Sequence, residues 1–149
     1  MMKITYKGDY SLKIVLDLAL HYNQGLVTIH ELAKRADIPI KFLEQVLLEL
    51  KQGGFVDSKR GINGGYFLAK PPKEIKLGDV VRFIEGPIEP LPCANPEVIY
   101  KGCADIYKCV FKDIWRRVTH SISEIIDDVT FEDLCEKVTE QKKAMVYQI

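Results

Sequence analysis

The chain of 149 residues is long enough for one domain, or for one small domain with an extension. Hydrophobic residues make up 47% and charged residues 28%, an ordinary composition for a folded soluble protein, and no apolar run reaches the roughly 18 residues that span a bilayer. The N-terminus lacks the apolar core of a signal peptide, so we expect a cytoplasmic protein with reduced thiols and no membrane partner.

Charge is distributed unevenly, although the formal net charge is zero. Residues 1–73 carry 11 Lys and Arg against 7 Asp and Glu, whereas residues 74–149 carry 10 against 14. A basic first half can direct one face of a protein toward phosphates. Chance asymmetry would give the same counts, so the distribution permits a nucleic-acid partner without establishing one.

Two helices are predicted near the N-terminus. Apolar residues at helical spacing over 12–20 predict the first, and Asp9 stands where its N-cap is expected. Thr28 and Glu31 have the spacing of a capping box, in which each side chain accepts from the backbone N–H of the other residue. They predict a short second helix that ends near residue 35.

A third helix and a β-hairpin are predicted next. The helix follows a tight turn at 36–39 and ends at the glycine pair 53–54. Its apolar stripe consists of Leu43, Val46, Leu47 and Leu50. Residues 55–58 and 66–68 are predicted strands, joined by a glycine-rich loop over 59–65. Three helices followed by a hairpin are typical of a winged helix-turn-helix.

The second half is predicted to contain a short helix, a long loop and two further helices. The short helix covers 77–85, and a proline-rich loop runs from 86 to about 102. A long helix from about 104 to 128 precedes a capping motif at Thr130 and a last helix. The long helix has a heptad-like apolar seam of Phe111, Trp115, Val118, Ile122, Ile125 and Val129. This seam favours contact with a partner subunit over packing against the chain's own domain.

These elements predict a mostly α fold with a small β-hairpin wing. We expect a winged helix-turn-helix DNA-binding domain over 1–86, a cysteine-bearing loop over 87–103, and a dimerisation helix with a C-terminal helix over 104–149.

The third helix has a second face whose side chains can read base edges in a major groove. Lys41 can bond guanine or a phosphate, Gln45 can pair with adenine, and Glu44 can accept from the cytosine amino group. Phe42 can touch a thymine methyl group. A solvated polar face is the alternative interpretation, but the hairpin that follows favours DNA contact.

The loop of the hairpin adds a second candidate DNA contact. Arg60 lies beside Gly61 in a thin loop that can enter a minor groove, where negative potential favours arginine, and Asn63 can assist it. The alternative is a plain hairpin turn. Candidates for phosphate contacts, which position a protein without reading sequence, are Lys3, Lys7, Thr28 and Lys59.

Three of the four cysteines lie close together in the sequence. Cys93, Cys103 and Cys109 have the spacing C-x9-C-x5-C. Thiolates select iron–sulfur clusters, zinc or copper(I), and the close pairs preferred by structural zinc are absent. Wider spacing suits an iron–sulfur cluster. Free thiols or a disulfide switch remain alternatives, and Cys135, on an apolar helical face, is expected to be a packing residue.

The sequence resembles the Rrf family of bacterial repressors. The similarity covers about residues 2–135 and is carried by KITYKGDYSLKIVLDLAL, LEQVLLELKQGGFVDSKRGINGGYFLAK, LGDVVRFIEG, the cysteine loop and CVFKDIW. The resemblance implies a homodimer with crossing long helices and a palindromic double-stranded DNA operator contacted by residues 41–45 and Arg60. It also implies that Cys93, Cys103 and Cys109 hold an iron–sulfur cluster at the dimer interface.

The resemblance also bears on the fourth cluster ligand. IscR-like members use a histidine three residues after the last cysteine, where this chain has Lys112, a poor ligand. NsrR-like members use an aspartate near the N-terminus that reaches over from the other subunit, and Asp9 matches that position. Ligation by Asp9 favours a 4Fe–4S cluster, with 2Fe–2S possible. The first gap between cysteines is longer than the family's commoner pattern, which leaves the subgroup open.

The sequence therefore predicts a DNA-binding transcriptional repressor that senses redox state, nitric oxide or iron–sulfur status. Two alternatives stay open: a cluster-free thiol-switch regulator, and a winged-helix module that binds proteins. An enzyme is not expected, because the chain has no paired carboxylates, nucleophile–base signature or phosphate-binding loop.

Overall fold

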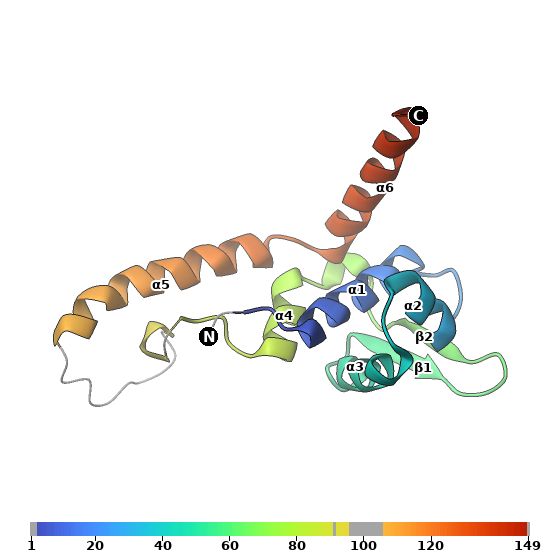
Figure 1. Ribbon diagram of the computed structural model, residues 1–149, viewed down its shortest axis with the longest axis horizontal. Coiled ribbons are helices and arrows are strands. Elements are labelled where there is room, and N and C mark those ends of the chain that lie inside the picture. Colours follow the sequence, from blue (N-terminus) through green and yellow to red (C-terminus); the bar gives the residue numbers. More distant parts are fainter. Residues whose placement is uncertain (1–2, 91, 96–105, 149) are drawn as a thin grey trace.

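The computed structural model describes residues 3–90, 92–95 and 106–148 (Figure 1). The elements in chain order are α1 (Tyr6–Leu20), α2 (Ile29–Ala36), α3 (Ile40–Gln52), β1 (Val56–Lys59), β2 (Gly65–Leu68), the 3-10 turn η1 (Pro72–Glu74), α4 (Leu77–Glu85), the 3-10 turn η2 (Pro92–Ala94), α5 (Ile106–Asp127) and α6 (Phe131–Tyr147). Helices dominate, and β1 and β2 form an antiparallel hairpin, which confirms the predicted fold class.

Helix α1 begins earlier than the sequence predicted. Thr5 is its N-cap, and the Thr5 hydroxyl accepts a hydrogen bond from the Gly8 N–H at 3.2 Å. Asp9 lies inside the first turn, where its carboxylate pairs with the Lys13 ammonium at 2.9 Å. The prediction of Asp9 as the cap was wrong because the first turn has no apolar periodicity to mark the start of the helix.

The helix-turn-helix follows the prediction closely. Thr28 and Glu31 form the expected capping box at the start of α2. The chain turns through Asp37, whose φ of 54° lies in the left-handed region, and Pro39 precedes α3. The predicted apolar stripe of α3 is buried, with Leu43 and Leu50 at 0% exposure.

The hairpin is fixed to the helices by a third short strand segment. Val27, just before α2, exchanges two backbone hydrogen bonds with Tyr66 of β2, at 2.8 and 2.9 Å. A Cβ atom at Gly65 would lie 2.7 Å from the Val27 carbonyl oxygen, so only glycine allows this approach. The base of the wing is therefore held in a fixed position relative to α2 and α3.

Helix α1 lies at the centre of the core. It packs against α2, α3, α4, α6 and β2. Its fully buried side chains include Ile14 and Val15, and Leu32, Leu47, Val80 and Phe131 from other elements join the same cluster. This core supports α3 from behind and leaves its opposite face to solvent.

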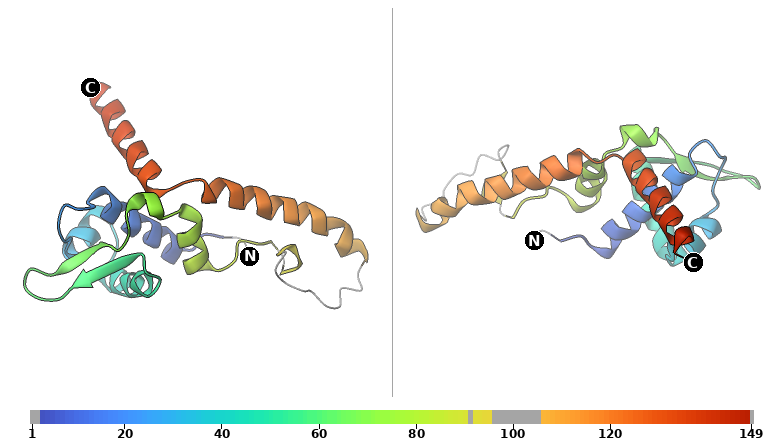
Figure 2. Two further views of the ribbon diagram at one scale, coloured as in Figure 1. Left: turned by 180° about the vertical axis from the view of Figure 1, so that it is seen from behind. Right: turned by 90° about the horizontal axis from the view of Figure 1, so that it is seen from above.

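Helix α5 extends away from this body as an arm, whereas α6 starts beside α1 and points in another direction (Figure 2). The base of the arm is anchored by a bidentate pair between the Arg82 guanidinium and the Asp127 carboxylate, at 2.7 and 2.8 Å. Beside it, the Phe131 N–H donates to the Ile75 carbonyl at 3.0 Å. Among the described residues, none of the helices combines the length and hydropathy needed to cross a bilayer.

The anchor of the arm is expected to weaken in acid. The Arg82 guanidinium holds the pKa of Asp127 below its ordinary value of 3.8. A lowered folded-state pKa means that the stabilisation is complete above 3.8 and is lost as the pH falls through the folded-state pKa. The pair is partly exposed, so its contribution is about 1 kcal/mol or less, which is about 2–4 °C in Tm for a chain of this size.

This expectation is tested with Asp127→Asn. At neutral pH the variant should melt below the wild type by that margin, and the difference should shrink below pH 3.8. Asp128→Asn, a substitution of the exposed neighbour, is the control and should not change Tm. A difference for Asp127→Asn that persists unchanged in acid would contradict the proposed anchor.

Candidate nucleic-acid interface and cysteine site

The predicted DNA-reading face of α3 is exposed along its whole length. Lys41, Glu44 and Gln45 are solvent-exposed, opposite the buried stripe. The Phe42 side chain is 47% exposed, and the Lys41 ammonium lies 5.3 Å from the centre of its ring. Leu48, on the same face, is 58% exposed. Exposed apolar and hydrogen-bonding side chains on one helical face suit a partner with both methyl groups and polar edges, as in a major groove.

Two aromatic residues of α1, which the sequence did not predict as part of the site, lie beside this face. Tyr6 is 83% exposed, and its ring lies 6.3 Å from that of Tyr10. A cavity of about 370 Å³ separates these residues from α3 and is lined by Tyr6, Lys7, Tyr10, Phe42, Gln45 and Val46. Two aromatics four residues apart before an apolar stripe are the signal that could have identified them.

The wing carries its predicted contact residues at an exposed tip. Lys59 ends β1, and Arg60 and Asn63 follow in the turn, all exposed. Gly61 has a φ of 117°, and a Cβ atom at Gly64 would overlap the Lys59 carbonyl oxygen, so the turn needs both glycines. The hairpin projects beyond the helices in Figures 1 and 2.

Thr28 occupies the N-terminus of α2, but its hydroxyl group is already engaged. It accepts from the Glu31 N–H at 3.2 Å and donates to the Glu31 carboxylate at 3.0 Å. A phosphate contact at this position therefore requires the hydroxyl to leave its partner Glu31.

The structure describes the three clustered cysteines to different extents. Cys93 lies in η2, is half-buried and forms no disulfide. Turn η2 packs against α5, and the buried Ala94 follows Cys93. Cys109 lies one turn into α5, and only its backbone position is described. Cys103 lies outside the described residues. Helix α5 therefore carries one cysteine and contacts the turn that holds another.

Asp9 is not brought together with these cysteines within one chain. Its carboxylate is half-exposed and paired with Lys13. Within the described part of the chain, no three His, Cys, Asp or Glu side chains come close enough together to hold a metal ion. Two of the three histidines have other contacts: His21 hydrogen-bonds to the Asp17 carbonyl at 2.8 Å, and His120 pairs with Glu124 at 3.2 Å.

Cys135 is separate from the other cysteines and packs against the core from α6. It lines a groove between α6 and the end of α1. Burial raises the pKa of the Cys135 thiol, so it is less reactive than an ordinary thiol. This agrees with its predicted packing role.

A helix-turn-helix with an exposed second helix and a glycine-rich hairpin defines a winged-helix DNA-binding protein. The chain belongs to the Rrf2 family, since the family model, described as an iron-dependent transcriptional regulator, matches residues 4–137. The resemblance noted from the sequence is thereby confirmed. It follows that the chain is a transcriptional regulator of a DNA-binding family and not an enzyme.

Individual relatives support the same assignment. An Rrf2-like HTH-type transcriptional regulator of Rhodobacter capsulatus is 39% identical over 88% of this chain and 91% of its own length. The structure of CymR, the global cysteine regulator of B. subtilis, has a TM-score of 0.75 at 34% identity and covers 92% of this chain and 98% of its own. T. potens IscR has a TM-score of 0.73 at 31% identity, covering 93% and 90%.

Proposed function

We propose that the chain is a cytoplasmic, homodimeric repressor. Its affinity for a palindromic operator depends on an iron–sulfur cluster held by Cys93, Cys103 and Cys109. The main observation behind the proposal is that η2, which contains Cys93, packs against α5, which contains Cys109. The family is also described as iron-dependent. We assign DNA binding to residues 1–86, sensing to residues 87–103 and dimerisation to residues 104–149.

DNA reading is assigned to α3 and the wing. Lys41, Phe42, Glu44 and Gln45 face a major groove from the exposed side of α3, and Arg60 enters the adjacent minor groove with Asn63. Phosphate contacts by Lys59 and by the α2 N-terminus at Thr28 fix the position of the protein on the duplex. The fixed base of the wing supports this assignment, because it holds the hairpin that carries Arg60 against the segment before α2.

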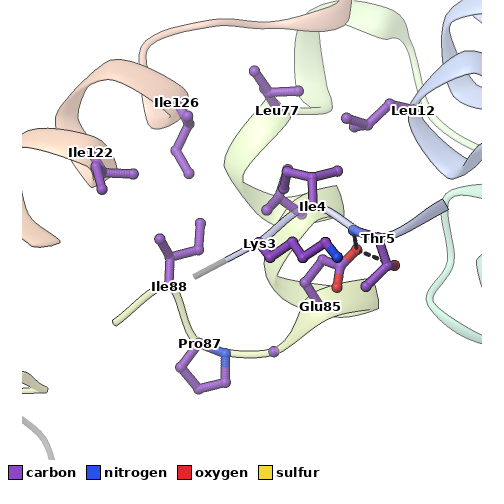
Figure 3. Close-up of a pocket in the computed structure, with 12 residues that line it drawn as sticks. Lys3, Ile4, Thr5, Leu12, Leu77, Glu85, Pro87, Ile88, Ile122 and Ile126 are labelled. Carbon is purple, nitrogen blue, oxygen red and sulfur yellow. Dashed lines mark hydrogen bonds between the residues drawn. The ribbon is translucent and has the colours of Figure 1, made fainter. Parts of the chain in front are cut away.

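Dimerisation is assigned to α5 and to an apolar groove at its base. The outer part of the arm exposes large apolar side chains: Val110 is 67%, Phe111 is 51% and Ile114 is 50% exposed. A cavity of about 550 Å³ lies at the base of the arm, between α5, α4 and residues 3–5 (Figure 3). Its apolar lining comprises Ile4, Leu12, Leu77, Val81, Pro87, Ile88, Ile122 and Ile126. Exposed apolar surface of this extent is typical of an interface, and a second α5 has the complementary chemistry.

The donor chemistry fits an iron–sulfur cluster, because three soft thiols lie on one loop and the helix that follows it. When bound, the cluster supplies iron that reacts with oxidants and nitric oxide. Asp9 from the partner subunit is the proposed fourth ligand, and its carboxylate must first leave Lys13, 2.9 Å away. Ligation by Asp9 favours a 4Fe–4S cluster, and a 2Fe–2S cluster is the alternative.

A cluster-free thiol switch is the second candidate. It is favoured by the similarity to CymR, which has also been solved in an oxidised form from Staphylococcus aureus, with a TM-score of 0.70 at 30% identity over 91% of this chain and 97% of its own. In this alternative, an oxidant would take two electrons from two of these thiols, which would release two protons and form a disulfide that alters the loop. A winged-helix module that binds proteins instead of DNA is the third candidate.

Binding to a duplex of the chain's own promoter region separates these functions. A repressor should bind in an anaerobic titration, and log K should fall linearly with log salt, with a slope of about −0.9 for each phosphate contact. Brown protein with iron and sulfide supports the cluster, and colourless protein that responds to oxidants supports the thiol switch. If the protein shows no salt-dependent binding to the promoter, both DNA-binding candidates are wrong and the protein-binding module is the remaining one.

A further inference from the structure

A separate set of contacts joins the end of α4, which leads into the cysteine-bearing loop, to α3 through residues 5–9, the N-cap and first turn of α1. We propose that Glu85, this turn and Glu49 form a relay, through which the state of the loop sets the position of α3 against DNA. The relay rests on the proposed function, because it takes α3 as the reading helix and the loop as the sensor. Glu85 and Glu49, the two ends of the relay, position the reading helix and are not assigned a DNA contact.

The first contact of the relay is made by Glu85, the last residue of α4. Its Oε1 atom accepts hydrogen bonds from the Thr5 N–H at 2.8 Å and from the Thr5 hydroxyl at 2.6 Å (Figure 3). Because Thr5 is the N-cap of α1, the carboxylate lies at the positive end of that helix, where negative charge is favoured. Only Gly86 and Pro87 separate Glu85 from Ile88 of the loop, which lines the same groove as Ile4.

Gly8 makes this contact possible. A Cβ atom at position 8 would overlap Glu85 Oε1, so any other residue would push the carboxylate away from the helix end. Glycine inside a helix is unfavourable relative to alanine. The close approach of Glu85 gives a physical reason for a poor helix former at this buried position.

The second contact links the same turn to α3. The Lys7 ammonium lies 3.2 Å from the Glu49 carboxylate, and Glu49 stands one helical turn after Gln45 of the reading face. The cavity of about 370 Å³ beside this pair leaves the turn loosely packed against α3. The cavity leaves space between the turn and α3, so the Lys7–Glu49 ion pair is the contact that would transmit a displacement of the turn to α3.

Polar contacts with Glu85 and Glu49, and not buried apolar side chains, hold the outer side of this turn. A change in either contact can therefore alter its position. Ile4 is 51% and Tyr6 is 83% exposed, whereas full burial of α1 apolar side chains begins at Ile14. Asp9, the proposed ligand of the partner's cluster, lies in the same turn. In a dimer, two contacts can therefore displace this turn. One is the contact of Glu85, which responds to the chain's own loop, and the other is the ligation of the partner's cluster by Asp9.

The test is a double-mutant cycle on binding of metal-free, reduced protein to its own promoter duplex. Glu85→Ala and Glu49→Gln remove the two ends of the relay, and neither residue is assigned a DNA contact. The Kd of the double variant should differ from the product of the single effects by roughly threefold or more. Glu85→Gln keeps an acceptor oxygen for Thr5 and should restore the wild-type coupling.

Matched variants keep the cycle interpretable. Glu132→Gln removes an exposed acid on the remote α6 and should combine with Glu49→Gln additively. Gly8→Ala displaces the Glu85 carboxylate while improving helix propensity, so it tests the relay if Glu85→Ala does not fold. Purely additive effects of Glu49→Gln with both Glu85→Ala and Gly8→Ala would overturn the relay.

A second measurement follows the signal. We expect the ratio of promoter Kd between cluster-loaded and metal-free wild type to be on the order of 5–150. Gly8→Ala should bring this ratio close to one while iron and sulfide content stay at the wild-type level. If cluster-loaded and metal-free wild type have the same promoter Kd, the proposed cluster sensing is wrong. The double-mutant cycle on metal-free protein still tests the relay in that case. A protein that does not bind the promoter overturns both.

Discussion

Replacement of Cys93 with alanine is expected to give a folded protein that retains neither iron nor sulfide after anaerobic reconstitution. Cys93 is half-buried in a three-residue turn, so removal of its sulfur atom changes little packing. The cluster, however, loses one of its three proposed thiolate ligands. The measurements are iron and sulfide analysis, visible absorbance, and the promoter Kd of reconstituted and metal-free protein, which should become equal.

Cys135→Ala is the matched control for this prediction. Cys135 is also a half-buried free cysteine, but it packs on the core from α6. The control should retain iron and sulfide at the wild-type level, along with its dependence of promoter binding on the cluster. Full iron and sulfide in Cys93→Ala would remove Cys93 from the ligand set. A colourless wild type whose DNA binding changes on oxidation would favour the thiol switch.

The helix-turn-helix was predictable because its signals are local. The capping box at Thr28 and the apolar stripe of α3 each fix an element within a few residues, and the structure confirms both. The start of α1 was not predictable in this way. Its cap, Thr5, is held by Glu85, which is 80 residues away in the sequence. A contact over that separation leaves no periodic pattern near Thr5.

The two candidate sites differed in predictability for the same reason. The exposed face of α3 follows directly from its buried stripe, so Lys41 and Gln45 could be identified as exposed from spacing alone. The surroundings of Asp9 could not be predicted in this way. Asp9 and Lys13 form an i,i+4 pair because both lie inside α1, whereas the sequence placed Asp9 at the cap. The exposed Tyr6 was missed for the same reason.

Arg60→Ala is expected to weaken binding to the promoter duplex by about 1–3 kcal/mol, or roughly 5- to 150-fold. Arg60 stands at an exposed wing tip, and the Val27–Tyr66 hydrogen bonds fix the base of that wing before DNA is bound. A planar guanidinium fits a narrow minor groove, and its loss leaves the groove's negative potential without a partner. Fluorescence anisotropy at one fixed salt concentration measures the change.

Two variants separate the contribution of Arg60 from simple loss of charge. Lys142→Ala removes one positive charge from the exposed face of α6 and should change the promoter Kd by less than about twofold, since screening limits effects beyond about 10 Å. Arg60→Lys keeps the charge and should recover only part of the affinity, because an ammonium is more strongly hydrated than a guanidinium. The loss caused by Arg60→Ala should also be larger on A·T-rich than on G·C-rich flanks, because A-tracts narrow the minor groove. Equal losses on both flanks, with complete recovery by lysine, would instead make Arg60 a phosphate contact that positions the wing without reading sequence.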